Sequence, residues 1–336
     1  QSHMTARLPL LYSADHTQHA PPSEFNQGTL IPCSDAPTRI ETIRQALQLA
    51  GQVQELPFAP PADLLPALRQ VHAPHLLAYL SRRGADLPEG RYIYPERHDP
   101  RPSAHTRYPD GAFAYDVFSP IGRGTWPAAL AAAGLALQAA DLLRNGCPAA
   151  YALCRPPGHH ATRQQIGGYC YLNNAVLAAR RLRRLGRIAL LDLDYHHGNG
   201  SQELLQNSAE IAMASLHADP ANEYPYTSGY AEERGRFGQI LNLPLPSGCN
   251  GATYHAALQQ ALRFLRLFRP AALIVSLGFD TAQDDPTGSF ALQSQDYAAI
   301  GAELAAQKLP TLLIQEGGYG ATVGACASAF VSGFLG

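Results

Sequence analysis

Charge is scarce in this chain, and neither sign dominates. Only 15% of the 336 residues are charged, and 25 Lys and Arg oppose 27 Asp and Glu, for a formal net charge of −2. Proteins that bind nucleic-acid phosphates usually carry a strong basic excess, so this balance argues against nucleic acid as a partner. Apolar residues make up 46% of the chain, which excludes a disordered protein and indicates a globular one.

Cysteine pairs and long apolar runs are also missing. The six cysteines form no Cys-x-x-Cys pair, a pattern typical of reduced, buried thiols rather than of a disulfide framework. The most apolar stretch, residues 128–143, is interrupted by Gln138 and Asp141, and we expect it to be too short to span a bilayer. We therefore expect a soluble, cytoplasmic protein with no membrane partner. Residues 1–4 resemble an expression-tag remnant, and residues 5–336 are expected to form one domain.

Short apolar segments alternate with segments of helical periodicity along much of the chain. The expected strands are 149–154, 188–193, 211–216, 272–277 and 311–315, and the expected helices include 127–145 and 174–185. Apolar strands separated by helices indicate an α/β fold, with a mainly parallel β-sheet covered by helices on both faces. The segment at about 87–127 has no clear period, so we expect a functional or interface loop there.

Polar residues gather where the expected strands end, which is the edge of an open parallel sheet at which ligands bind. Asp194 and His196 follow one strand and alternate along extended backbone, so both side chains can face one point. Asp280 follows another strand. Two carboxylates and an imidazole leave coordination positions open, as in catalytic zinc sites; two solvent-facing acids and a turn histidine are the alternative. The set suits Zn²⁺ and Fe²⁺ alike.

Two adjacent histidines and a tyrosine follow further expected strands. His159 and His160 come after Arg-Pro-Pro-Gly, and Asp192 and Asn199 are their expected partners, respectively. A carboxylate partner favours an imidazolium, whereas an amide orients the ring without adding charge, so His160 is the better candidate for a neutral base. Tyr319, between glycines, is either a donor to an oxyanion or a packed core residue.

Six ordered motifs resemble the zinc-dependent histone deacetylase superfamily, whose members have the arginase–deacetylase fold. They are RPPGHH (155–160), GGYCYLNNA (167–175), LDLDYHHGNG (191–200), SLH (215–217), SLGFDTAQDDP (277–286) and EGGYG (316–320). The resemblance runs from about Leu11 to Phe334 and is strongest to the bacterial acetylpolyamine amidohydrolases, with YSADH at 12–16 and Gly-Thr-Trp at 124–126. It implies hydrolysis of an acetamide to an amine and acetate.

The resemblance also implies a role for each site residue. The residues that would bind one catalytic Zn²⁺ are Asp194, His196 and Asp280. The catalytic residues would be His160 as general base and acid oriented by Asn199, His159 as an electrostatic partner backed by Asp192, and Tyr319 as donor to the carbonyl oxygen. A structural K⁺ would lie near Asp192, Asp194, the His196 carbonyl, Ser215 and Leu216. The substrate tunnel would be walled by Tyr169 and Tyr224, and the Gly168 carbonyl would accept the substrate amide N–H.

The expected substrate is an N-acetylated polyamine or a related small acetylated amine. Glu24 stands where the polyamine enzymes place an amine-binding acid, and Asp110 near a second; an ordinary surface acid is the alternative for each. The chain departs from the polyamine pattern at Asn26, at Thr287 and at Phe118, which is close to Asp116. An acetyl-lysine protein deacetylase and a non-catalytic acetyl-amine binding module are the alternatives. In the polyamine branch the irregular loop builds a dimer, so we expect a homodimer.

Overall fold

The computed structural model describes residues 7–97, 104–107 and 109–336, most of whose strands form one large parallel sheet. Among these residues the sheet has eight strands, in the order β4-β1-β5-β10-β9-β6-β7-β8. They are β1 (Leu8–Leu11), β4 (Val53–Leu56), β5 (Ala149–Ala152), β6 (Ile188–Asp192), β7 (Ile211–Ala218), β8 (Ile240–Leu245), β9 (Ala272–Leu277) and β10 (Thr311–Gln315). Neighbouring strands run parallel, so their carboxyl ends lie at one edge.

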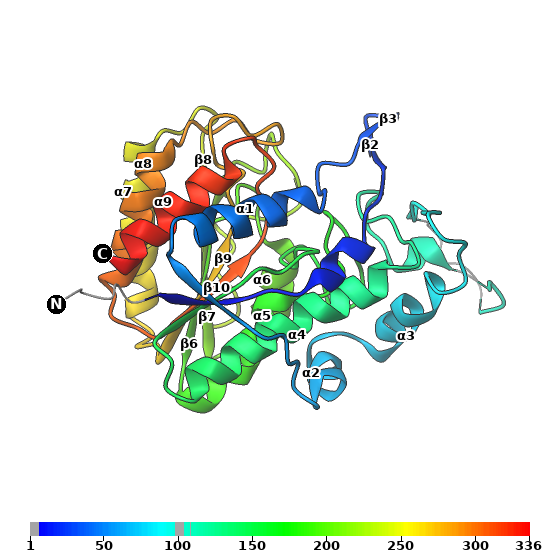
Figure 1. Cartoon of the computed structure of the whole chain (residues 1–336), viewed down its shortest axis with the longest axis horizontal. Helices are drawn as coiled ribbons and strands as arrows, with labels where there is room; N and C mark the ends of the chain where they lie inside the picture. The colour runs from blue at the N-terminus through cyan, green and yellow to red at the C-terminus, as the bar shows by residue number, and fades with distance from the viewer. Residues whose placement is uncertain (1–6, 98–103, 108) are drawn as a thin grey trace.

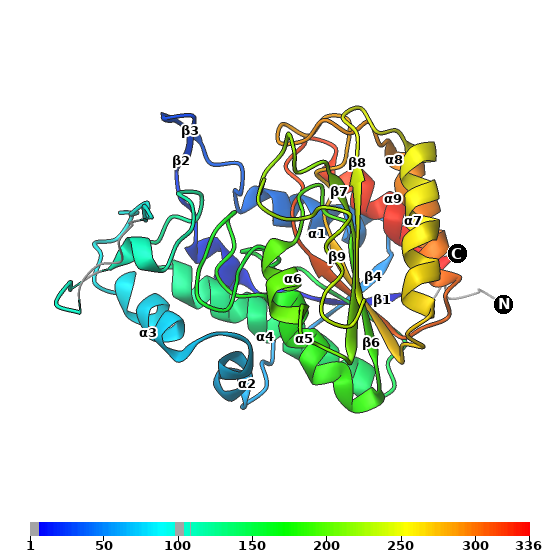
Figure 2. The same cartoon turned by 180° about the vertical axis from the view of Figure 1, so that it is seen from behind.

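Helices cover both faces of this sheet (Figure 2). One face is covered by α4 (Thr125–Arg144) and α5 (Asn174–Leu182), and α2 (Leu64–Val71) and α3 (Pro74–Arg83) join the same hydrophobic cluster farther from the sheet. The other face is covered by α1 (Thr38–Leu49), α7 (Gly251–Arg266), α8 (Ser294–Ala305) and α9 (Val323–Leu335). The pleat of the strands divides the core in the same way, since Ile188 and Leu190 of β6 join the first layer whereas Ala189 and Leu191 join the second. The predicted α/β fold is confirmed.

Each expected strand and helix is present, with bounds that differ by a few residues. The sequence did not indicate β1, β4 and β8. β4 and β8 are the outermost strands and bury only part of their length, so they lack the continuous apolar run by which the other strands were found. β1 has only four residues, and one of them is proline.

The apolar helix α4 corrects one expectation. It extends over 20 residues and, by length and composition alone, is the one helix in the described part of the chain that is apolar enough to cross a membrane. The expectation that this stretch, interrupted by Gln138 and Asp141, is too short to span a bilayer is therefore wrong by length and composition. However, 67% of its most apolar window is buried within the protein, and its alanines pack in the core beneath the sheet. This burial is typical of a core helix.

Two segments extend beyond the layered core. β2 (Ser23–Asn26) and β3 (Thr29–Pro32) form an antiparallel hairpin that stands apart from the large sheet (Figure 1). The described part of the predicted irregular loop contains a short 3₁₀ turn at Asp110–Ala112 and an isolated bridge between Ile93 and Ile121, and it ends where α4 begins. Residues 98–103 and 108 of this loop, and the expected tag remnant at 1–4, lie outside the described residues.

Candidate active site

A pocket of about 380 Å³ opens at the carboxyl edge of the sheet. Its buried end is lined by Gly317 and by five residues of the expected site: His159, His160, Asp194, His196 and Tyr319. Its outer part is lined by the hairpin and by loops, with Glu24, Phe25, Asn26, Ile31, Phe118, Tyr169, Tyr224, Tyr226 and Thr287 among the contributors. The pocket therefore joins the strand ends to the segments that extend beyond the core.

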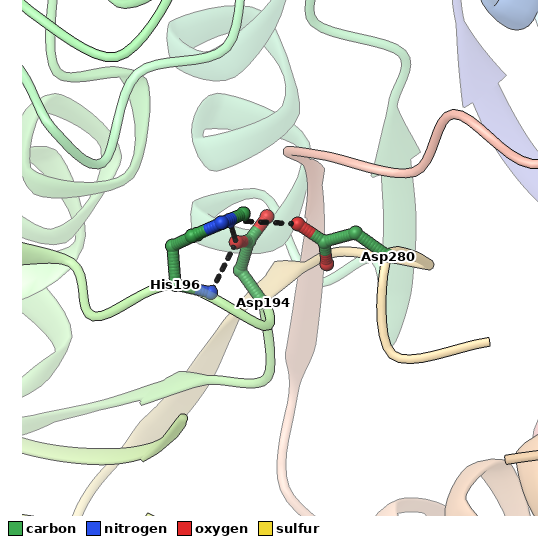
Figure 3. Close-up of side chains that lie close together, drawn as sticks. All are labelled: Asp194, His196 and Asp280. Carbon is green, nitrogen blue, oxygen red and sulfur yellow. Dashed lines mark hydrogen bonds and ion pairs between the residues drawn. The ribbon is translucent and has the colours of Figure 1, made fainter. Parts of the chain in front are cut away.

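Three side chains that could hold a metal ion meet next to the buried end of the pocket (Figure 3). One ligand atom from each of Asp194, His196 and Asp280 lies within 4.8 Å of the other two. His196 Nδ1 is 3.2 Å from Asp280 Oδ2 and 3.6 Å from Asp194 Oδ1. Asp194 and Asp280 come together because they follow β6 and β9, which are neighbours in the sheet. The structure thus brings together the three residues that the sequence selected.

This donor set fits a divalent cation. Asp194 and Asp280 are at most 1% exposed, and burial followed by the charge of Asp194 raises the pKa of Asp280 to about 8. A cation between the carboxylates would remove their repulsion. Backbone N–H groups fix the carboxylates, since Gly317 donates to Asp194 Oδ2 and Tyr195 donates to Asp280 Oδ1, each at 2.8 Å. One imidazole and two carboxylates are a donor set that catalytic zinc sites use.

The paired histidines differ in their partners and therefore in charge. His159 Nδ1 lies 2.9 Å from Asp192 Oδ2, and His160 Nδ1 lies 2.7 Å from Asn199 Oδ1. Burial lowers the pKa of His159, but the carboxylates of Asp194 and Asp192 outweigh it and raise this pKa well above its usual value. Burial, followed by the charge of His159, lowers the pKa of His160 well below its usual value. His160 is therefore the neutral imidazole of the pair.

Tyr319 contributes a phenol to the same end of the pocket. Its backbone N–H and that of Gly320 donate to Asp285 Oδ2, at 2.6 and 3.1 Å, and these bonds fix the glycine-rich segment. The Arg39 guanidinium lies 5.2 Å from the centre of the Tyr319 ring. Burial raises the pKa of Tyr319 well above its usual value, so the hydroxyl keeps its proton and can donate a hydrogen bond.

The predicted tunnel walls are held from behind by a carboxylate. Asp116 Oδ2 accepts from the Tyr224 hydroxyl at 2.6 Å and from the Gly168 N–H at 3.1 Å. Gly168 and Tyr169 both have positive φ, 52° and 67°. A Cβ atom on Gly168 would lie 2.4 Å from His160 Cδ2, so this position accommodates only glycine. Asp116 thus faces inward and does not line the pocket, although Phe118 does.

The two acids expected near the substrate amine have different surroundings. Glu24 lines the pocket; its Oε1 accepts from the Tyr169 hydroxyl at 2.9 Å and its Oε2 from the Ser34 N–H at 2.8 Å. Burial raises the pKa of Glu24. Asp110 does not reach the pocket, because its carboxylate binds Arg83 Nε at 2.8 Å and the Tyr79 hydroxyl. Asp110 therefore lies outside the lining of this pocket, and its role as a second amine-binding acid stays a prediction.

Glu316 is a further residue of the site, and the sequence did not indicate a role for it. Its Oε2 accepts from the N–H groups of Gly158 at 2.8 Å and of His159 at 3.2 Å, and its Oε1 accepts from Ser276 Oγ at 3.1 Å. These bonds tie the histidine loop to β9 and β10. Burial raises the pKa of Glu316 to about 7. Its place directly after β10, in the EGGYG motif, was the signal that could have identified it.

A parallel α/β sheet with an Asp-His-Asp set, a neutral histidine and a phenol at its carboxyl edge is an arrangement suited to metal-assisted hydrolysis. The comparison with known proteins makes this class specific. The histone deacetylase domain matches residues 34–334, and the chain belongs to the histone deacetylase family. The family resemblance carried by the six motifs is therefore confirmed.

Several relatives are similar over nearly their whole length. Acetylpolyamine amidohydrolase 2 of Pseudomonas aeruginosa is 38% identical over 328 residues, covering 92% of this chain and 93% of that protein. The acetylpolyamine amidohydrolase of Burkholderia pseudomallei is 38% identical over 336 residues, covering 96% and 97%. A crystal structure of the acetylpolyamine aminohydrolase from Burkholderia pseudomallei matches with a TM-score of 0.91 and 37% identity, over 97% of this chain and 98% of that one.

Proposed function

We propose that this protein is a zinc-dependent deacetylase that hydrolyses N-acetylated polyamines or related small acetylated amines to the free amine and acetate. The observation that carries the proposal is that Asp194 and His196 line the buried end of one pocket with the neutral His160 and the phenol of Tyr319, and that the buried Asp280 lies beside the first two. The polyamine substrate is supported by the names of the relatives and by Glu24, a carboxylate farther out along the pocket.

The general base of this reaction would be His160. A Zn²⁺ ion held by Asp194, His196 and Asp280 would polarise the acetamide carbonyl and lower the pKa of a bound water from about 16 to about 7. With its Nδ1 bonded to Asn199, His160 has only Nε2 available to accept a proton from the attacking water. The same nitrogen then protonates the leaving amine. The neutral state of His160 is what this role requires.

Tyr319 and His159 would act on the negative charge that develops at the substrate. The Tyr319 hydroxyl donates to the carbonyl oxygen, a contribution typically worth about 10²–10³ in rate. The imidazolium of His159, held by Asp192, adds positive charge beside His160. The rings of Tyr169 and Tyr224 would flank the alkyl chain of the substrate, and the Gly168 carbonyl would accept its amide N–H.

Selection of the amine would fall to Glu24. A carboxylate that already accepts two hydrogen bonds is held in a fixed position and can pair with a protonated amine. The outer pocket is otherwise apolar or neutral, with Phe118, Asn26 and Thr287 in its lining. The pocket would therefore favour a small acetylated amine whose protonated nitrogen lies as far from the acetamide as Glu24 lies from the buried end of the pocket.

A substrate panel tests the proposal. We expect kcat/KM to be higher for acetylputrescine or acetylspermidine than for an acetyl-lysine peptide. A clear preference for the peptide would indicate a protein deacetylase instead. Absence of turnover with every substrate, in protein with a full zinc complement, would contradict an enzymatic function and favour a binding module.

We further infer a structural K⁺ and a homodimer from the family. The K⁺ would lie where β6 and β7 end, a region in which Asp192 is paired with Ser215 in the strand register and Leu216 and Asp194 are close along the chain. The dimer would use the irregular loop, next to a hairpin whose Leu30 is 56% exposed. A higher unfolding temperature in K⁺ than in N-methylglucamine would support the ion. Light scattering at twice the chain mass would support the dimer, and the mass of a single chain would contradict it.

A further inference from the structure

Tyr115 forms a hydrogen-bonded network with the general base although it does not line the pocket. Its hydroxyl lies 2.9 Å from the backbone oxygen of His160 and 3.2 Å from Asn199 Nδ2. Asn199 Oδ1 in turn lies 2.7 Å from His160 Nδ1. The three residues therefore form a closed ring of contacts behind the imidazole, and the reaction described above assigns no role to Tyr115.

The direction of each hydrogen bond in this ring follows from counting protons. A carbonyl oxygen can only accept, so the single hydroxyl hydrogen of Tyr115 is donated to the His160 backbone. Toward Asn199 the phenol can then only accept, and the side-chain NH₂ of Asn199 must face it. The carbonyl oxygen of Asn199 consequently faces His160 Nδ1, which must carry a hydrogen. The remaining ring nitrogen, Nε2, is left with its lone pair free.

The other neighbours of the Tyr115 hydroxyl do not change this count. Tyr224 Oη lies 3.2 Å from it, but the Tyr224 hydrogen has a closer and charged acceptor in Asp116 at 2.6 Å. Asn199 Oδ1 is 3.5 Å from the Tyr115 hydroxyl, much farther than the carbonyl at 2.9 Å. The hydroxyl hydrogen of Tyr115 thus has one good acceptor, the backbone oxygen of His160.

The chain is built to hold Tyr115 at this position. Its backbone N–H donates to the oxygen of Ile166 at 3.2 Å, and the N–H of Ile166 donates to the oxygen of Phe113 at 2.8 Å. A Cβ atom on Gly167 would lie 2.2 Å from Tyr115 Cζ, so the absence of a side chain there makes room for the ring. These contacts fix the position of the Tyr115 hydroxyl although the backbone there is neither helix nor strand.

We infer that Tyr115 is a positioning residue that sets the orientation of the Asn199 amide and, through it, the tautomer of His160. The two ends of an asparagine side chain have nearly the same shape, so Asn199 by itself can face the imidazole with either its oxygen or its NH₂. With the NH₂ toward Nδ1, the hydrogen of His160 would move to Nε2, and the base would lose its lone pair. The kinetic consequence rests on the proposed function, but the tautomer can be measured without substrate.

Nitrogen-15 NMR of zinc-loaded, histidine-labelled protein measures the tautomer directly. We expect His160, identified by the signal lost in His160→Ala, to carry its proton on Nδ1, and we expect Tyr115→Phe to shift its signals toward a mixture of tautomers. A wild-type His160 protonated on Nε2, or a Tyr115→Phe spectrum identical to that of the wild type, would overturn the inference.

A double-mutant cycle with Asn199→Asp tests the same inference by kinetics. Both oxygens of a carboxylate accept, so an aspartate at 199 cannot be turned the wrong way. We expect Tyr115→Phe to lower kcat about tenfold with little change in KM, but to lower it less than about twofold when Asn199 is already Asp. Equal losses in the two backgrounds would mean that Tyr115 acts through structure alone and would overturn the inference.

Tyr79→Phe is the matched control, because it removes another buried hydroxyl, bonded to Asp110 away from the pocket. It should leave kcat unchanged. Unfolding temperatures of all variants separate loss of fold from loss of positioning. If the wild-type protein turns over no acetylated amine, the proposed function fails while the NMR result still decides the role of Tyr115.

Discussion

The two ends of the pocket are built in different ways. At the buried end, side chains follow β5, β6, β9 and β10, and the polar groups are fixed by partners such as the Gly317 N–H on Asp194 and Asn199 on His160. At the outer end, the lining comes from a hairpin and from loops, and apart from Asp194 the one carboxylate in the described lining is Glu24. Tyr226, at 57% exposure, is typical of how open this end is.

This difference separates chemistry from substrate choice. Under the proposed function, the rigid strand ends would place the groups that act on the acetamide, whereas the irregular segments would decide which amine can reach them. Substitutions at the buried end should therefore lower kcat for every substrate. Substitutions at the outer end should change KM, and should do so for some substrates more than for others.

The largest expected effect comes from Asp280→Ala at the buried end. Removing one of the three proposed zinc ligands should abolish zinc binding and reduce turnover of every acetylated amine to background. Metal analysis of the purified variant checks the first point and a deacetylation assay the second. Asp284→Asn is the control, because Asp284 belongs to the same motif but bonds Thr322 instead of facing the pocket. A full zinc complement in Asp280→Ala would refute the ligand set.

Tyr319→Phe should have the next largest effect. Loss of the phenolic donor should lower kcat by about 10²–10³ while zinc content stays normal. Tyr226→Phe is the matched variant at the outer end of the pocket. It also removes a tyrosine hydroxyl from the lining, and it should leave kcat nearly unchanged. A near-normal kcat in Tyr319→Phe would contradict the role assigned to its hydroxyl.

Glu24→Gln should affect binding and not chemistry. A hydrogen bond to a charged group contributes about 1.5–3 kcal/mol, so KM for a cationic substrate should rise by roughly 10- to 100-fold with kcat little changed. A neutral acetamide of the same length should show no such rise. An equal fall in kcat for both substrates would mean that Glu24 contributes to the chemical step, and it would contradict the separation of catalysis at the buried end from substrate selection at the outer end.

The pH dependence of KM provides a second measure of Glu24. Burial raises the pKa of its carboxyl, and only the ionised form attracts a protonated amine. As the pH falls through this raised pKa, the carboxylate takes up a proton, and KM for the cationic substrate should rise. Glu24→Gln has no such group, so its KM should be flat over the same range. Parallel curves for the two proteins would exclude Glu24 as the cause.

Asp110→Asn should have the smallest effect. Its carboxylate pairs with Arg83 near the surface, and pairs of this kind contribute about 1 kcal/mol or less to the free energy of unfolding. Denaturant unfolding should show a loss of that size, and KM should match the wild type for charged and neutral substrates alike. A selective rise in KM for the cationic substrate would restore Asp110 to the substrate site.

The buried end could be predicted from the sequence because its residues are tied to strands. The apolar strands that precede Asp194, His196 and Asp280 run parallel, so the ends of these strands lie together. The local sequence pattern was therefore enough to predict that the three side chains meet. Asn199 was identified for the same reason. Glu316 also follows a strand, β10, but its partners are backbone N–H groups of a distant loop and the Ser276 hydroxyl, so the sequence marks its position and not its role.

The outer end could not be predicted as well, because no periodicity orients its side chains. Asp110 and Asp116 both lie in the irregular loop, and the sequence cannot tell that one faces Arg83 and the other faces Tyr224. The role of Tyr115 depends on hydrogen-bond directions across three segments. The outermost strands β4 and β8 were missed because partial burial removes the apolar run.

The most direct test of the central claim is anomalous diffraction at the zinc absorption edge from crystals of the zinc-loaded protein. We predict one strong anomalous peak from a zinc ion that lies about 2.0–2.2 Å from one ligand atom of each of Asp194, His196 and Asp280. A zinc ion bound elsewhere, or no bound ion between these three side chains at full loading, would contradict the account.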